Sequence, residues 1–203
     1  MGRGRKREFD IDEALDRAVD LFWRQGYEGT SVADLSAVMG ISPSSMYGAF
    51  GSKRELFDRV LARYGARQRP MLDEAMSAAT AAAAARALLV GAARAATEPG
   101  RPAGCLTIQG GMACDDETRQ VAETLAAARA ATQERMRLRF ERGIAEGDVA
   151  PDADGDALAR YVATVAQGIV VQAAGGATRE QLVAVAEAAA GSLALVARPA
   201  APA

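Results

Sequence analysis

One stretch of the chain constrains its fold more than any other, because it carries the start and stop signals of consecutive short helices. Residues 31–57 read SVADLSAVMGISPSSMYGAFGSKRELF. Ser31 and Asp34 have the spacing of a capping box at a helix start, and Gly40 can end that helix in a left-handed conformation. Pro43, directly after a serine, suits the first position of a second helix. The stretch therefore predicts two short helices joined by a tight turn.

The second of these helices, over residues 43–50, has one apolar side made by Met46 and Phe50. The positions left outward are small or polar, namely Ser44, Ser45, Tyr47 and Gly48. A third helix follows at once, because residues 52–55 read SKRE, a further capping box. Such a unit is a helix-turn-helix, whose second helix enters the major groove of DNA. An ordinary αα-hairpin has the same caps and the same glycine, and it is the alternative interpretation.

The composition predicts an all-α protein of about nine helices. The chain has 203 residues, of which 50% are hydrophobic and only 5% aromatic, and alanine makes up the excess. Alanine favours helix and lets helices pack closely, and no alternating strand pattern is present. The most apolar run, residues 78–96, contains two arginines and does not resemble a membrane span. We therefore expect a cytoplasmic protein without a membrane partner.

Charge is distributed unevenly along the chain. The net charge of −2 does not by itself indicate a nucleic-acid-binding protein. A basic arm lies at the start of the chain, made by Arg3, Arg5, Lys6 and Arg7. Because salt screens charge over about 10 Å, a local basic region on an acidic protein can still bind phosphate. The arm is therefore either a solvated tail or a DNA-binding segment.

The absence of histidine excludes several kinds of site. It removes histidine general bases, Ser-His-Asp and Cys-His arrangements and the usual zinc sites. No phosphate loop or nucleophile–base set is present, so the sequence predicts neither an enzyme, nor a metal site, nor a cofactor. The two cysteines, Cys105 and Cys114, are too few for a disulfide framework. They leave a redox-responsive regulator as an alternative function, through a bridge between subunits or a single oxidised thiol.

Two domains are expected, a DNA-binding domain over residues 1–69 and a helical domain over residues 70–203. In the first, a helix capped by Asp10 ends at Gly26 and places Trp23 in the core. The helix that begins at Ser52 should end near residue 68, because Pro70 breaks or kinks a helix. The second domain should contain one or two helices over residues 71–97, a short one over 104–114, a long one capped by Asp115, and two apolar helices over about 158–170 and 178–196.

The stretch from Thr30 to Phe57 resembles the DNA-binding signature of the tetracycline-repressor (TetR/AcrR) family of bacterial regulators. The shared positions include Gly40, Tyr47 and Phe50 and the SKRELF segment at residues 52–57. The resemblance implies DNA-binding residues in the helix-turn-helix at Thr30 and Lys53, and base reading would fall to Pro43, Ser44, Ser45, Tyr47 and Gly48. The basic arm, by its charge and position, adds Arg3, Arg5 and Arg7 as candidate DNA contacts. Thr30, Tyr47 and Lys53 would contact phosphate.

The second helix departs from the common pattern at Gly48-Ala49, where many relatives have larger residues. Direct base readout should therefore be thin, and phosphate contacts and DNA shape should contribute more. The family also implies a homodimer, a palindromic operator and a repressor that an unknown small-molecule effector releases. Candidate effector contacts are Ile108, Gln109, Met112, Met136, Tyr161 and Gln167, each of which is also compatible with plain core.

The last two helices have more apolar surface than one monomer would cover, which permits an oligomer. In the family these helices pair with those of a second copy in a four-helix bundle. The expected dimer interface consists of Leu158, Val162, Val165, Ile169, Leu182, Val185, Ala189 and Leu193.

Overall fold

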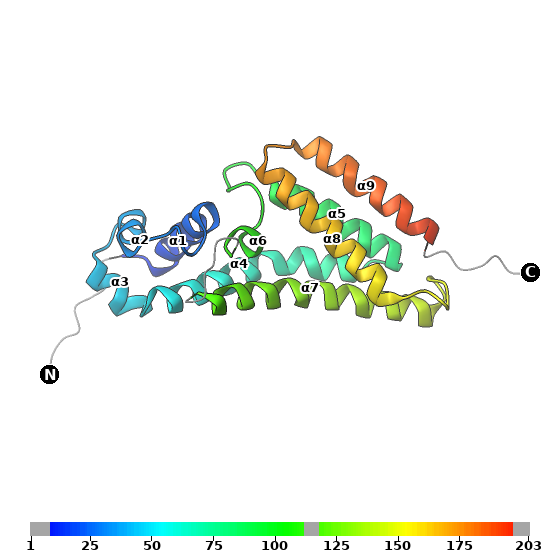
Figure 1. Ribbon diagram of the computed structural model, residues 1–203, viewed down its shortest axis with the longest axis horizontal. Coiled ribbons are helices and arrows are strands. Elements are labelled where there is room, and N and C mark those ends of the chain that lie inside the picture. The colour runs from blue at the N-terminus through cyan, green and yellow to red at the C-terminus, as the bar shows by residue number, and fades with distance from the viewer. Residues whose placement is uncertain (1–8, 112–117, 197–203) are drawn as a thin grey trace, which may run out of the picture.

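The computed structural model describes residues 9–111 and 118–196, and this part of the chain contains nine helices and no strand (Figure 1). The helices are α1 (Ile11–Gln25), α2 (Val32–Met39), α3 (Pro43–Phe50), α4 (Lys53–Met76), α5 (Ala81–Ala96), α6 (Leu106–Gln109), α7 (Arg119–Glu146), α8 (Gly155–Ala174) and α9 (Arg179–Val196). The predicted all-α class is confirmed. Helices α1–α3 lie at one end of the molecule, and α5, α8 and α9 lie at the other.

The first three helices begin and end where the sequence signals predicted. The carboxylate of Asp10 accepts hydrogen bonds from two backbone N–H groups of the first turn of α1. Ser31 and Asp34 form a reciprocal capping box at α2, and Ser52 forms another with Glu55 at α4. Gly40 has φ 70°, a left-handed conformation that favours glycine, and it turns the chain from α2 into α3. The order of these elements is that of a helix-turn-helix.

Helix α4 is longer than predicted, because it continues through Pro70 to Met76. A proline inside a helix loses one hydrogen bond, to the carbonyl of the residue four positions earlier. That residue is Ala66, and both Ala66 and Pro70 are exposed, so water can solvate the released carbonyl. The expected helix end near residue 68 is therefore wrong. The domain boundary at residue 69 stays a prediction.

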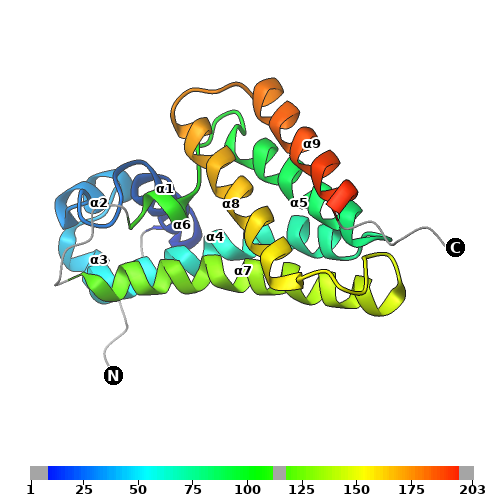
Figure 2. The same cartoon turned by 45° about the vertical axis from the view of Figure 1, so that its right-hand side comes forward.

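The second part of the chain forms a helical bundle whose core is rich in alanine. Helix α5 packs against α8 and α9, and α7 packs against α8 (Figures 1 and 2). On α5 the buried positions include Ala81, Ala84, Ala85 and Ala93, which let neighbouring helices approach closely. Phe140 on α7 is the one aromatic residue in this buried cluster of described residues.

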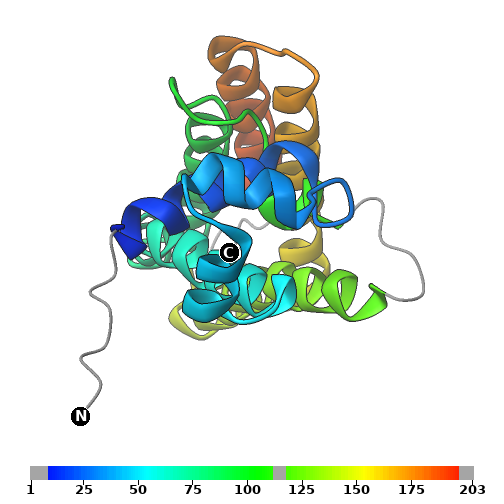
Figure 3. The same cartoon turned by 90° about the vertical axis from the view of Figure 1, so that its left-hand side faces the viewer.

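The two parts are not separate, because the second contributes to the core of the first. Leu106 of α6, with Val121 and Leu125 of α7, belongs to the buried cluster formed mainly by α1–α4. The short helix predicted over residues 104–114 is observed only as the four residues of α6. Asp115, the predicted cap of the long helix, lies outside the described residues, and α7 begins at Arg119. Figure 3, which looks onto the α1–α3 end, shows α6 directly behind that end.

Helix α8 is long and apolar enough, by length and composition alone, to cross a membrane. In the fold it packs against α5, α7 and α9. Its buried face includes Ala159, Val162 and Ile169, as in a core helix of a helical bundle. Packing inside the bundle thus accounts for the apolar character of one face of the helix.

Candidate functional site: a nucleic-acid interface and an internal cavity

Helix α3 has an apolar side buried in the core and an opposite side exposed to solvent. The hydroxyl of Ser42 accepts from the backbone N–H of Ser45 at 3.1 Å and caps the helix. Met46 and Phe50, which are 0% and 1% exposed, fix the inner side of α3 in the core. The outer side consists of residues that are all exposed, namely Pro43, Ser44, Ser45, Tyr47 and Gly48. The structure therefore brings the five predicted base-reading residues onto one accessible face.

The middle of this face is open. Tyr47 is 51% exposed. A Cβ atom added at Gly48 would have no neighbour within 4 Å. Gly48 therefore leaves α3 with a flat surface on which a DNA groove could approach the backbone closely. None of the five residues on this face carries a charge, which agrees with the expectation of few base contacts.

Lys53 is the first residue of α4 and follows two positions after Gly51, which ends α3. Its ammonium group lies 4.2 Å from the ring centroid of Tyr27, a cation–π contact that orients the side chain. Partial burial lowers the pKa of Lys53, and the carboxylate of Glu28 acts in the opposite direction. A positive charge is thus fixed at a helix N-terminus, where the backbone also favours anions.

Thr30 does not fit its predicted role as a phosphate contact. Its side chain is 0% exposed, and its hydroxyl donates to the carbonyl oxygen of Gly26 at 2.6 Å. The hydroxyl therefore stabilises the turn between α1 and α2 and does not face solvent. The other predicted DNA contacts, Arg3, Arg5 and Arg7, lie outside the described residues.

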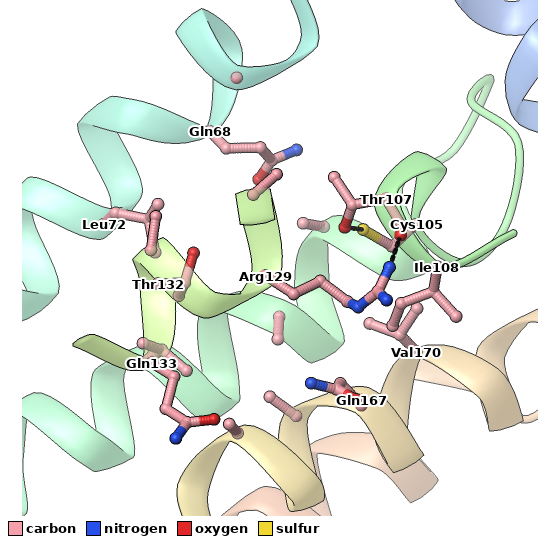
Figure 4. A pocket seen from close by; sticks show the side chains of 18 of the residues that line it. Gln68, Leu72, Cys105, Thr107, Ile108, Arg129, Thr132, Gln133, Gln167 and Val170 are labelled. Carbon is pink, nitrogen blue, oxygen red and sulfur yellow. Dashed lines mark hydrogen bonds between the residues drawn. The ribbon is translucent and has the colours of Figure 1, made fainter. Parts of the chain in front are cut away.

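A cavity of about 360 Å³ lies in the second part of the chain, bounded by α4, α5, α6, α7 and α8 (Figure 4). Its size is within the range usual for small-molecule sites. Most of its lining is apolar, with Leu72, Leu88, Met136 and Val170 among the contributors. The polar lining residues include Gln68, Thr107, Arg129, Thr132, Gln133 and Gln167. The arrangement is that of a ligand pocket with a few polar groups for orientation.

The six predicted effector contacts fall into three groups. Ile108, Met136 and Gln167 line the cavity. Gln109 and Tyr161 do not, because Gln109 points to the DNA-binding part and Tyr161 lies on the outer face of α8 with 40% exposure. Met112 lies outside the described residues. Gln109 and Tyr161 thus lie outside this cavity, and their role as effector contacts stays a prediction.

Gln109 instead joins the two parts of the molecule. Its side-chain oxygen accepts from the indole N–H of Trp23 at 3.0 Å and from the backbone N–H of Cys105 at 2.9 Å. The Tyr64 hydroxyl donates to the Cys105 sulfur at 3.1 Å, and burial is the main cause that raises the pKa of Tyr64. Residues of α1 and α4 thus hold the loop and helix that form one wall of the cavity.

Three further contacts strengthen this connection. The backbone N–H of Tyr27 donates to the carbonyl of Gly110 at 3.1 Å, directly after α6. Arg101 pairs with Asp20 at 3.4 Å. Between α4 and α7, the Arg54 guanidinium donates to the hydroxyl of Thr124 at 2.8 Å. Any movement of α6 or of the first turns of α7 would therefore move groups bonded to the helix-turn-helix domain.

The sequence analysis missed Arg129, although a signal for it was present. On α7 the residues Leu125, Arg129, Thr132 and Met136 recur at spacings of four, three and four, so they share one face of the helix. A charged residue on such a face needs a partner or a function. The Arg129 guanidinium donates to the carbonyl oxygen of Thr107 and lines the cavity.

The predicted dimer interface lies mostly inside the monomer. Buried residues of the α5–α9 core include Leu158, Val162, Ile169, Leu182, Ala189 and Leu193. Val165 is half-buried against this core, and only Val185 is exposed, at 41%. The apolar stripes that suggested an oligomer are covered by α5 and by each other, so most of these residues belong to the core of the monomer.

The outer face of α8 and α9 is nevertheless apolar and built from small residues. Its exposed members are Ala157, Tyr161, Thr164, Gly168 and Val171 on α8, with Ala184, Val185, Ala188 and Gly191 on α9. The two helices pack side by side, as Figure 2 shows, so these residues form one surface. Among the described residues, this surface carries the exposed apolar side chains Tyr161, Val171 and Val185.

The redox hypothesis gains no support from Cys105. Its sulfur is engaged by two neutral hydroxyls, that of Tyr64 at 3.1 Å and that of Thr107 at 3.0 Å. Cys114 lies outside the described residues. No group of three or more potential metal ligands occurs among the residues placed in the structure.

Comparison with known proteins gives matches along almost the whole chain. The sequence model described as "Bacterial regulatory proteins, tetR family" matches residues 14–60, and that of "Tetracyclin repressor-like, C-terminal domain" matches residues 81–189. The chain is 35% identical over 190 residues to the HTH-type transcriptional repressor ComR of Escherichia coli (strain K12), covering 91% of this chain and 89% of ComR.

Solved structures agree with these matches. A cysteine-substituted TetR family transcriptional regulator, CifR, complexed with 26-base-pair double-strand operator DNA, has 41% identity and a TM-score of 0.88. This alignment covers 93% of this chain and 99% of that one. The structure named "Putative TetR transcriptional regulator from Rhodococcus sp. RHA1" has 43% identity and a TM-score of 0.63, and the alignment covers 91% of this chain and 99% of that one.

Proposed function

Because the chain belongs to the TetR family of bacterial regulatory proteins, we propose that it is a transcriptional repressor that a small molecule releases from its operator. The observation that carries this proposal is the exposed face of α3, which is capped, rigidly supported and open at Gly48. The repressor name of ComR and the operator DNA bound by CifR support the same conclusion.

DNA binding would depend on the α3 face and the groups at its rim. The face enters the major groove, and Lys53 and Tyr47 contact phosphates on either side. The basic arm at Arg3, Arg5 and Arg7 adds sequence-independent affinity. With an uncharged reading helix, a large share of the specificity would come from DNA shape. Thr30 acts in this proposal only by fixing the turn that positions α2.

The protein would act as a homodimer that uses the outer face of α8 and α9. Tyr161, Val171 and Val185 are 40%, 52% and 41% exposed in the monomer, and pairing with a second copy would bury them. Gly168 and Gly191 have open space above their Cα atoms, so helices of the partner could approach closely. A twofold dimer then binds a palindromic operator.

Release would begin in the cavity. A ligand shifts the equilibrium between two forms only by its difference in affinity for them. The cavity wall at Cys105, Thr107 and Ile108 is continuous with Gln109 and Gly110, which are bonded to Trp23 and Tyr27 of the DNA-binding part. A ligand that displaces this wall would therefore reorient α3. The role requires no turnover and no membrane, and we place the protein in the cytoplasm as a non-enzyme.

The decisive experiment is a gel shift against the DNA flanking the protein's own gene, made with the variants G48E and G48A. The Gly48 position has open space, so both variants should fold with wild-type unfolding midpoints. The glutamate would project a negative charge into the groove, and we expect it to abolish binding, whereas alanine should leave most of it.

The matched control is A66E, which adds the same charge to the exposed face of α4. It should bind the operator with an affinity within a factor of about three of the wild type, because surface changes away from the contact have small effects. Equal binding by G48E and A66E would show that α3 is not the reading helix. Failure of the wild type to bind at low salt would refute the repressor proposal.

A further inference from the structure

The chemistry of the cavity restricts what its effector can be. The walls are apolar over most of their area, so the body of a ligand must be apolar as well. Among the lining residues that the structure describes, two are cationic, Arg129 and Arg135, and none is an aspartate or glutamate. The cavity therefore carries positive charge that its own wall does not neutralise.

The two arginines differ in their partners. Arg135 forms an ion pair with Asp73 of α4 at 2.6 Å, so its charge is matched. Arg129 donates to the carbonyl oxygen of Thr107 and makes no ion pair within the described residues. A guanidinium has five N–H donors in a fixed fork, and a single backbone carbonyl leaves most of them unused. A partly buried charge in this state favours an anionic partner.

The groups around Arg129 make one end of the cavity polar. Figure 4 shows the Arg129 guanidinium with Thr107 on one side and Gln167 on the other. The Gln167 amide makes no hydrogen bond within the described part of the chain, so it is available as a further donor. Away from Arg129, Leu72, Leu88 and Met136 provide apolar wall, and Gln68, Thr132 and Gln133 add uncharged polar groups.

We propose that the effector is an apolar monocarboxylate, whose carboxylate is bound by Arg129 and Gln167 and whose body fills the apolar remainder of the cavity. The planar fork of arginine matches a carboxylate with two parallel hydrogen bonds. One unmatched arginine corresponds to one negative charge, which favours a carboxylate over a phosphate dianion. This inference rests on the proposed function, because it names the ligand class of the same cavity.

The test uses purified full-length protein and two carboxylates of different shape, decanoate and naphthoate. Decanol and decylammonium, which share the alkyl chain of decanoate, serve as the neutral and the cationic control ligands. Calorimetry should show binding of at least one carboxylate at least about tenfold tighter than either control ligand, since a hydrogen bond to a charged group contributes a factor of about ten to a hundred. Equal affinity for decanol, or no binding of either carboxylate, would overturn the proposal.

Variants assign the effect to the residue. R129Q should weaken carboxylate binding by about ten- to hundredfold and change decanol binding by less than about threefold, while R129K should recover part of the loss. The matched control is R142Q on the same helix, because Arg142 pairs with Glu146 at 3.5 Å outside the cavity. An R129Q protein that binds the carboxylate like R142Q would also overturn the proposal.

A second readout separates this inference from the proposed function. The carboxylate concentration that releases half of the bound operator should rise about ten- to hundredfold in R129Q. If the wild type binds its operator but no carboxylate binds or releases it, the ligand class is wrong and the repressor proposal stands. If the carboxylate binds with the expected variant pattern but no operator is found, the repressor proposal fails alone.

Discussion

The two parts of this molecule build their cores from different side chains. The DNA-binding part packs aromatic rings against each other, with Phe57 at 4.9 Å from Phe22 and 5.1 Å from Tyr27 between ring centroids. Trp23 and Tyr64 form another edge-to-face pair at 5.1 Å. The α5–α9 part relies on alanine, and Phe140 is the single ring in its buried cluster of described residues. Large aromatic side chains fill the space between helices, whereas alanine side chains fill little of it, so helices packed through alanine are in contact only where their backbones come close.

This difference explains where the cavity lies. Aromatic side chains fill the space between α1 and α4, and Met46 and Phe50 of α3 belong to the same buried cluster. In the other part, alanine faces such as those of α5 bring the backbones close at some points and leave space at others. The DNA-binding part is thus built for a fixed geometry, and the second part is built with room for a ligand. The variants below test this contrast.

The largest effect is expected for F57A, because Phe57 is 0% exposed and contacts two other rings. Truncation of such a residue leaves a cavity and should lower the free energy of unfolding by about 4 kcal/mol. Urea unfolding at a fixed protein concentration measures the change. The control L138A, on an α7 side chain that is 51% exposed, should change it by less than about 0.5 kcal/mol. Similar losses for both variants would contradict the aromatic-core description.

In the alanine-rich part, the most sensitive point is a buried ion pair. Arg139 is 3% exposed and donates to Asp148 at 3.3 Å, and Asp148 also accepts from the backbone N–H of Ala81 at 2.9 Å. D148A would leave the Arg139 charge buried and unpaired, which should cost about 3 kcal/mol. Thermal unfolding measures the loss.

The matched experiment for this pair is the double variant R139M/D148A. With the arginine replaced by an apolar side chain of similar length, the buried charge is gone, and at least half of the lost stability should return. If the loss of stability in R139M/D148A equals the sum of the losses in R139M and in D148A, the two side chains do not act as a pair.

The next effect concerns Gln109, which connects the two parts of the molecule. Q109L removes the acceptor of the Trp23 indole N–H and of the Cys105 backbone N–H, and buried donors without partners should lower stability by about 2 kcal/mol. Because Trp23 is the only tryptophan, its fluorescence spectrum reports the change directly. An unchanged spectrum in Q109L would mean that Gln109 does not hold Trp23 in solution.

The contact of Gln109 with Trp23 could not be predicted from the sequence, whereas the helix caps could. The caps at Asp10 and Ser31 are local, since each depends on residues within one helical turn, and both were predicted correctly. The role of Gln109 depends on Trp23, which lies 86 positions earlier in the chain, and no local pattern reports such a pairing. The helix-turn-helix could therefore be predicted from the sequence, whereas the contacts of Gln109 that connect the two parts could not.

The burial of the residues predicted for the dimer face has a related explanation. Apolar periodicity identifies that Leu158, Val162 and Ile169 share one face of a helix, but it does not say which neighbour covers that face. The structure covers it with the core of the same monomer. Arg129 was within reach of the sequence, because a charge on an apolar helical face is a local signal. That Arg129 makes no ion pair within the described residues is a property of the fold, which no local pattern reports.

A smaller effect is expected at the reading helix itself. S42A removes the hydroxyl that accepts from the Ser45 N–H, and loss of such a cap should lower stability by about 1 kcal/mol. Because the cap fixes the exposed end of α3, operator affinity should also fall, whereas S77A, at the end of α4, should leave it unchanged. Anisotropy titrations with labelled operator compare the two variants. Equal operator affinity in S42A and S77A would show that the rigid aromatic support alone fixes α3.

The smallest effect is pH-dependent and concerns the surface between α1 and α4. The hydrogen bond from Arg63, at 2.7 Å, is the main cause that lowers the pKa of Asp16, with Arg67 and Arg101 contributing in the same direction. A carboxylate with a lowered pKa in the folded state stabilises the fold above its unfolded pKa of about 3.9. That contribution is lost as the pH falls through the still lower folded value.

The stability difference between the wild type and D16N should therefore be present at neutral pH, begin to shrink as the pH falls below about 4, and vanish only below the lowered pKa of folded Asp16. Because Asp16 is 37% exposed, water screens the pairs, and the difference should stay below about 1 kcal/mol. D152N, at an exposed carboxylate without an ion pair in the described residues, provides the pH-matched control. A larger difference for D16N than for S42A would mean that ion pairs hold the DNA-binding part together as firmly as its helix caps do.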